Sequence, residues 1–139
     1  MQSQRSLFLS SLVGVLLSVA PCPAQDKPDI KVVIPATKKV KAIHIEIYKT
    51  AKAEGYKLKL MDEKSVEPVL DWLKSIDFDP AKGRDGKAIK LAHFGSLEIL
   101  TRDGKSQYFG LADQMIDGGW LWPADTDKLL KVLKKAKGK

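Results

Sequence analysis

The chain has 139 residues, of which 24 are lysine or arginine, 17 are aspartate or glutamate and one is cysteine, and 44% are apolar. This composition fits one globular domain and excludes a disulfide scaffold, a collagen-like repeat and a disordered acidic chain. Two histidines and one cysteine are too few to predict a His/Cys zinc site, so we expect neither a metal nor a cofactor.

Residues 1–24 have the pattern of a secretory signal peptide. Arg5 precedes 14 apolar or small residues from Leu7 to Ala20, and Cys22 and Ala24 stand three and one residues before a cut at Gln25. The run is shorter than the about 20 residues that span a bilayer. We therefore predict a secreted or periplasmic protein with a cysteine-free mature chain and no stable membrane span. The alternative is a retained anchor.

Positive charge gathers at the two ends of the predicted mature chain. Residues 25–41 have net charge +3, residues 42–127 have net charge −3, and residues 128–139 carry six lysines and no acid. A nucleic-acid groove would be more uniformly basic, so we do not expect a nucleic-acid partner.

Residues 25–39 form a basic lead-in, in which Ile30–Ile34 predicts a short strand before Pro35. From Val40 to Lys49 the isoleucines alternate with other residues, and Tyr56–Met61 alternates in the same way. A period of two is typical of half-buried strands, and we expect these two to pair as a loose hairpin.

The period then becomes helical and later returns to that of strands. An apolar stripe predicts a helix that ends before Pro80. Asp62 or Ser65 can cap its start, and Pro68, which is tolerated only in the first turn, favours Ser65. Strands are predicted over residues 88–94 and 96–101 with a bulge at Gly95, and Asp103-Gly104 predicts a tight hairpin to residues 106–112. A short strand over residues 120–122 and a final helix capped by Asp125 or Thr126 follow. The stripes are Val66, Val69, Leu70, Leu73 and Ile76, then Leu129, Leu130, Val132, Leu133 and Ala136.

The element order is β-β-β-α-β-β-β-(β)-α. It predicts a single α+β domain over residues 40–137, with an antiparallel sheet of about four to six strands and two helices packed on one face.

Three residues are candidates for catalysis. His44 and Glu46 share the polar face of one predicted strand, where a further polar side chain from a neighbouring strand would complete an acid–base constellation. The competing interpretation is a solvated strand face. His93 alternates with apolar residues, and its simpler role is that of a partly buried, hydrogen-bonded side chain.

Tryptophans and lysines are the candidates for binding. Trp120 and Trp122 point to one face of their strand and form either an aromatic platform for sugars or part of the core; Trp72 lies off the helical stripe and is expected to be half exposed. The last helix could dock on an anionic surface, unless its lysines only form a solvated face that complements the helix dipole. Its candidate docking residues are Lys131, Lys134 and Lys135.

These features favour a non-catalytic binding or accessory module of the cell envelope or extracellular space, with an envelope protein, a glycan or another anionic surface as its partner. One alternative is a small hydrolase or lyase that uses His44 and Glu46. The other is an inhibitor or interaction domain that presents loop 80–87.

Overall fold

A computed structural model describes residues 30–85 and 91–138; the predicted signal peptide and its cleavage site lie outside them. The described elements are, in chain order, a short 3-10 helix at Thr37–Lys39, β1 at Val40–Ile47, β2 at Tyr56–Leu60, α1 at Glu63–Lys74, β3 at His93–Thr101, β4 at Ser106–Ala112, β5 at Met115–Asp117, β6 at Leu121–Pro123 and α2 at Thr126–Lys137.

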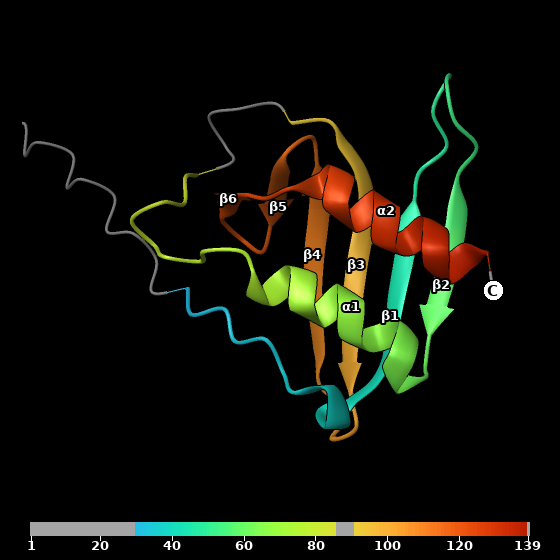
Figure 1. Cartoon of the computed structure of the whole chain (residues 1–139). Helices are drawn as coiled ribbons and strands as arrows, with labels where there is room; N and C mark the ends of the chain where they lie inside the picture. The colour runs from blue at the N-terminus through green and yellow to red at the C-terminus, as the bar shows by residue number, and fades with distance from the viewer. Residues whose placement is uncertain (1–29, 86–90, 139) are drawn as a thin grey trace, which may run out of the picture.

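The six strands form one sheet in the order β2-β1-β3-β4-β5-β6, and every neighbouring pair is antiparallel. Both helices cross the same face of this sheet (Figure 1). The predicted α+β class, with an antiparallel sheet covered on one side, is confirmed. Among the described residues, no helix covers the other face of the sheet.

Local signals in the sequence placed the hairpins correctly. β1 and β2 pair directly, the register of β3 shifts between His93 and Gly95, and Gly104 turns β3 into β4 with a φ of +86°. A positive φ suits glycine because it has no Cβ to clash with the backbone. The three predictions of a hairpin, a bulge and a tight turn are therefore confirmed.

The larger of the two apolar clusters lies between the sheet and the two helices. All five residues of the predicted α1 stripe are buried, and α2 adds Leu129 and Leu133, which are fully buried. Leu130, Val132 and Ala136 are only partly buried at the margin of this core. Fully burying a side chain of this size contributes roughly 1.5–3 kcal/mol, so this seam holds the helices on the sheet.

Two predicted strands differ from the structure. Residues 30–34 are not a strand; instead Ile30, Val32 and Ile34 pack against the core without joining the sheet. The strand expected from residue 88 begins at His93, and residues 88–90 lie outside the described residues. The structure also contains β5, which was not predicted.

Of the two candidate caps of the first helix, the favoured one, Ser65, was wrong. Asp62 is the cap, and its carboxylate accepts a hydrogen bond from the Ser65 N–H at 3.0 Å. Pro68 consequently lies inside the helix, beyond the first turn. Proline there leaves the Lys64 carbonyl without its helical donor, and both residues are exposed at the surface. Burial of the other face of the helix outweighs this loss.

Candidate functional site

The helix-free face of the sheet carries a cluster of polar side chains. Core residues such as Ile43, Ile45 and Leu97 point toward the helices, so the residues between them point to the other face. We call this surface the open face. On β1 to β5 it presents His44, Glu46, Lys57, Lys59, Ser96, Glu98, Ser106, Tyr108 and Asp117.

A chain of hydrogen bonds crosses three strands of the open face. His44 on β1, Glu98 on β3 and Tyr108 on β4 lie directly opposite one another in the strand register. His44 Nδ1 lies 3.2 Å from Glu98 Oε2, and the Tyr108 hydroxyl donates to the same carboxylate. The strand order and register therefore place Glu98 between His44 and Tyr108.

Glu98 is the centre of this chain. The hydrogen bond from Tyr108 is the largest cause that lowers the pKa of Glu98 below its ordinary value of 4.5; bonds from Ser106 and His44 add to it, and burial opposes them. A carboxylate that is ionised at neutral pH can only accept hydrogen bonds. His44 Nδ1 therefore carries a hydrogen and donates a hydrogen bond to the Glu98 carboxylate. The bond to Glu98 raises the pKa of Tyr108 above 10.0.

These residues line a shallow recess of about 410 Å³. Lys57 and Glu46 form an ion pair at 3.4 Å on its border, with both side chains substantially exposed. Tyr108 is 66% exposed, so its side chain is available to a ligand. The recess thus combines hydroxyl, ammonium and carboxylate groups with an exposed aromatic ring.

The second histidine lies on the same face, farther along the sheet. His93 Nε2 lies 3.2 Å from Asp117 Oδ2, and both side chains are about one-third exposed. Gly110 makes this pair possible, because a Cβ at residue 110 would lie 2.6 Å from the His93 ring. His93 is hydrogen-bonded, as one interpretation of the sequence expected, but it is not part of the recess at His44.

The sequence places His44 and Glu46 on one face of the strand, and we expected a further polar side chain from a neighbouring strand beside them. In the structure Glu46 pairs with Lys57, and His44 contacts Glu98. Glu98 and Tyr108 were missed. The alternation of β3 and β4 could have suggested their face, but only the strand register shows which residues lie opposite one another.

The tryptophans do not form an aromatic platform. Trp122 is 0% exposed and Trp72 is 2% exposed, so neither can contact a ligand. The expectation that Trp72 is half exposed was wrong because its indole reaches the second helix, where Nε1 donates to the Asp125 carbonyl at 2.7 Å. Trp120 is partly buried against the core.

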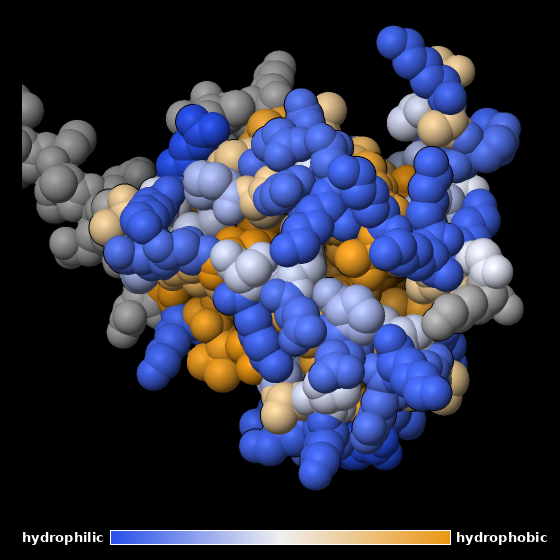
Figure 2. Space-filling view, in the orientation of Figure 1, coloured by the Kyte–Doolittle hydropathy of each residue, from blue (hydrophilic) through white to orange (hydrophobic). Residues whose placement is uncertain are grey.

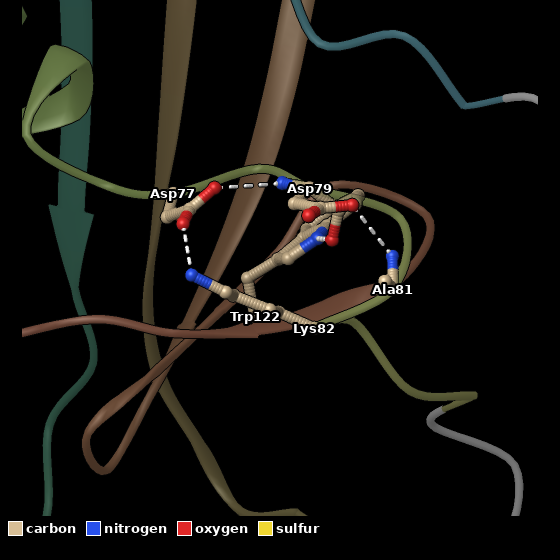
Figure 3. A network of polar contacts seen from close by, with 5 residues as sticks. All are labelled: Asp77, Asp79, Ala81, Lys82 and Trp122. Atoms are coloured by element: carbon tan, nitrogen blue, oxygen red, sulfur yellow. Dashed lines mark hydrogen bonds and ion pairs between the residues drawn. The ribbon is translucent and has the colours of Figure 1, made fainter.

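The described part of loop 80–87 is held against the sheet. The Asp79 carbonyl accepts a hydrogen bond from Trp122 Nε1 at 3.2 Å, and the Asp79 side chain accepts one from the Ala81 N–H (Figure 3). Lys82 pairs with Asp77, which lowers the pKa of that carboxyl group. Residues 86 and 87 of the loop lie outside the described residues. Within the described part of the loop, Arg84 bridges to Leu121, whereas Ala81 and Lys82 are exposed.

The candidate docking lysines on α2 are exposed, as are the other described lysines of this helix. Hydrophilic side chains cover much of this side of the molecule, and apolar atoms are visible between them (Figure 2). Lys137 has a further contact, because its Nζ lies 4.5 Å from the centre of the Tyr56 ring. These positions allow docking but also fit a solvated helix face.

Among the described residues, no group of three or more His, Cys, Asp or Glu side chains is arranged to hold a metal ion. Within the same residues, no helix has the length and hydropathy needed to cross a membrane. Comparison with protein-family models, curated proteins and solved structures finds no match for this chain.

Proposed function

We propose that this protein is an exported, non-catalytic binding module whose open face binds a hydroxyl-rich glycan. The observation that carries the proposal is the recess formed by His44, Glu98, Tyr108 and the Lys57–Glu46 pair. The secretory pattern of residues 1–24 supports export.

The chemistry of the recess suits a sugar better than a strongly charged ligand. Lys57 and Lys59 balance Glu46 and Glu98, so the lining is close to neutral when the histidine is neutral. Hydroxyl groups of a glycan can donate to the carboxylates and accept from the ammonium groups. The exposed Tyr108 ring offers an apolar surface to the C–H face of a sugar ring, with its hydroxyl as a polar handle.

One observation favours a hydrolase or lyase as the second candidate. Glu98 orients His44 through Nδ1, an arrangement that in enzymes leaves Nε2 for proton transfer. In this structure, however, Nε2 is covered by neighbouring atoms and has no hydrogen-bond partner among the described residues. A substrate cannot reach a covered nitrogen atom, so the geometry supports binding better than catalysis.

An array of defined, uncharged oligosaccharides tests the proposal. We expect the purified protein to retain a subset of them, and Tyr108→Ala to bind at least about tenfold more weakly because the aromatic contact is lost. Tyr48→Ala is the matched control, since Tyr48 is also an exposed tyrosine but does not line the recess.

Incubation with the retained oligosaccharide separates binding from catalysis. Intact sugar after prolonged incubation supports a binding module, whereas shortened products that disappear with His44→Gln establish the enzyme instead. If no oligosaccharide is retained, or if Tyr108→Ala binds as well as the unchanged protein, the glycan proposal is wrong.

A further inference from the structure

The two edges of the sheet are not equivalent. At the β6 edge, Arg84 forms a bridge with Leu121 in which each backbone N–H donates to the other residue's carbonyl at 2.9 Å. At the opposite end of the strand order, β2 has β1 as its only neighbouring strand among the described residues. β2 is therefore the edge at which a further strand can be added.

The backbone groups that β2 turns outward can be derived from its register. Tyr48, directly after β1, donates its N–H to a β3 carbonyl at 2.8 Å. Successive residues of a strand point their backbone groups to opposite sides, so Ile47 faces β2 and its partner Tyr56 faces β1. By the same alternation, Lys57 and Lys59 direct their N–H and C=O groups away from the sheet.

A groove runs alongside this edge on the helix side of the sheet. Its volume is about 550 Å³, and its apolar floor combines side chains of β2 with side chains of the last turns of α2. The apolar lining residues are Leu58, Leu60, Pro68, Val132 and Ala136, and the charged ones are Lys59, Asp62, Lys64 and Lys135. Asp62 is occupied as the cap of α1 and Lys59 points its side chain to the open face, so Lys64 and Lys135 dominate the charge of the groove.

We propose that the β2 edge binds an extended peptide in which apolar residues alternate with acidic ones. Peptide residues directly opposite Lys57 and Lys59 exchange backbone hydrogen bonds with them and place their side chains on the same face of the sheet. Acidic residues at these positions lie beside the two lysines. The residues between them point to the helix side, where the apolar groove lies.

Charge selects this partner over a second copy of the chain. If two β2 strands paired about a two-fold axis, the lysines of one copy would lie against those of the other, and like charges in cross-strand positions are destabilising. Lysines on an edge strand protect it against indiscriminate pairing. With an acidic partner, the same lysines make attractive contacts. This inference rests on the outward backbone groups of β2 and on the groove, so it does not depend on the glycan proposal, although Lys57 and Lys59 also line the recess.

Amide hydrogen exchange with a synthetic probe tests the site directly. The probe is a peptide of alternating leucine and aspartate, and the control peptide has lysine in place of aspartate. In the free protein we expect the amides of Lys57 and Lys59 to exchange faster than that of Leu58. The leucine–aspartate peptide should protect both lysine amides, and the leucine–lysine peptide should not.

Matched variants separate backbone pairing from charge. Lys59→Pro removes the outward N–H and the lysine, whereas Lys59→Val removes only the lysine, and proline is tolerated at an edge position that bonds outward. We expect Lys59→Pro to bind the acidic peptide about tenfold more weakly than Lys59→Val. Lys128→Glu, at an exposed position outside the groove, should bind within about twofold of the unchanged protein.

Modified peptides keep the test decisive even if Lys59→Pro does not fold. N-methylation of the aspartate nitrogens blocks the backbone ladder and should abolish binding, whereas N-methylation of the leucine nitrogens, which point away from β2, should not. Equal binding of the two methylated peptides overturns the proposal, as does equal binding of the leucine–aspartate and leucine–lysine peptides. Concentration-dependent self-association that protects Lys57 and Lys59 without peptide would show that a second copy occupies the edge instead.

Discussion

At the residue scale, one carboxylate, that of Glu98, connects side chains from three strands of the open face. Tyr108 on β4 and His44 on β1 both donate to Glu98 on β3. Because the carboxylate is ionised and accepts both bonds, it fixes the orientation of the imidazole and of the phenol ring. The recess is thus held in one arrangement before a ligand arrives, and this lowers the cost of ordering its side chains on binding.

Removal of the tyrosine hydroxyl should give a pH-dependent loss of stability. The pKa of Glu98 is lower in the folded protein than in the unfolded chain, so its contribution is present above the unfolded value and is lost as pH falls through the folded value. Tyr108→Phe should therefore melt below the unchanged protein between about pH 6 and 8, and the gap should close in acid because the protonated carboxyl no longer needs the donor.

The measurement is a series of thermal melts from neutral to acidic pH. The pKa of Tyr108 is raised, so its contribution should also fade as pH rises past its folded value. Tyr48→Phe, at another exposed tyrosine, should give no pH-dependent gap. A gap for Tyr108→Phe that stays constant down to strongly acidic pH would contradict the role given to Glu98.

At the element scale, the β3–β4 hairpin depends on a glycine with positive φ. A Cβ at Gly104 would meet no atom within 4 Å, so any cost of substitution comes from the backbone conformation and not from crowding. Gly104→Val should destabilise the domain by about 1 kcal/mol or more, since positive φ is unfavourable for a β-branched residue. Gly104→Asn should cost less because asparagine tolerates it. Equal thermal melts for the two variants would contradict this account.

A hydrogen bond from one indole joins the two helices. Trp72 on α1 donates to the Asp125 carbonyl at the start of α2, and Trp72→Phe removes this donor and leaves a small cavity. We expect a loss of about 2 kcal/mol in chemical denaturation. Trp120→Phe is the matched control, since Trp120 Nε1 has no partner among the described residues, and it should cost clearly less. If both variants lose the same amount, the hydrogen bond does not hold the helices.

The elements that sequence reasoning predicted are those with strong local signals. Asp103-Gly104, Gly95 and the helical stripe each define their own geometry within a few residues. β5 was missed because Gln114 turns the chain with a φ of +52°, without the glycine or asparagine that usually marks such a turn. Residues 30–34 have the composition of a strand, but a strand needs a pairing partner that composition does not reveal.

The candidate site was less predictable because its contacts also join residues that are far apart in the sequence. A strand's alternation assigns His44 and Glu46 to one face, but their partners depend on the neighbouring strands. Glu98 lies 54 residues after His44 in the chain and reaches it only through the β1–β3 register. Trp72 likewise belongs to the core because α2, and not its own helix, covers it. Long-range pairing decides both cases.

At the scale of the whole molecule, the two sides of the sheet differ in charge. α2 presents its lysines on the helix side, whereas the open face balances lysines with carboxylates. A concentrated positive charge attracts anionic surfaces at low ionic strength whether or not it is a specific site. Any attraction of α2 to anionic lipid must therefore be separated from ligand binding at the open face by its dependence on salt.

A fourfold substitution tests whether α2 docks on anionic membranes. Lys→Gln changes at Lys131, Lys134, Lys135 and Lys137 lower the formal net charge from +7 to +3, since four cations are lost. These side chains are exposed, so the fold should persist, with a small loss of stability from the Lys137–Tyr56 contact.

The Debye length shrinks from about 30 Å at 0.01 M salt to about 8 Å at 0.15 M. In vesicle sedimentation, we expect the unchanged protein to bind anionic vesicles weakly at the lower salt concentration and not at the higher one, and the variant to bind at neither. This result identifies the lysines as a solvated face that complements the helix dipole. Binding that persists at 0.15 M and disappears in the variant would instead make α2 a membrane-docking surface.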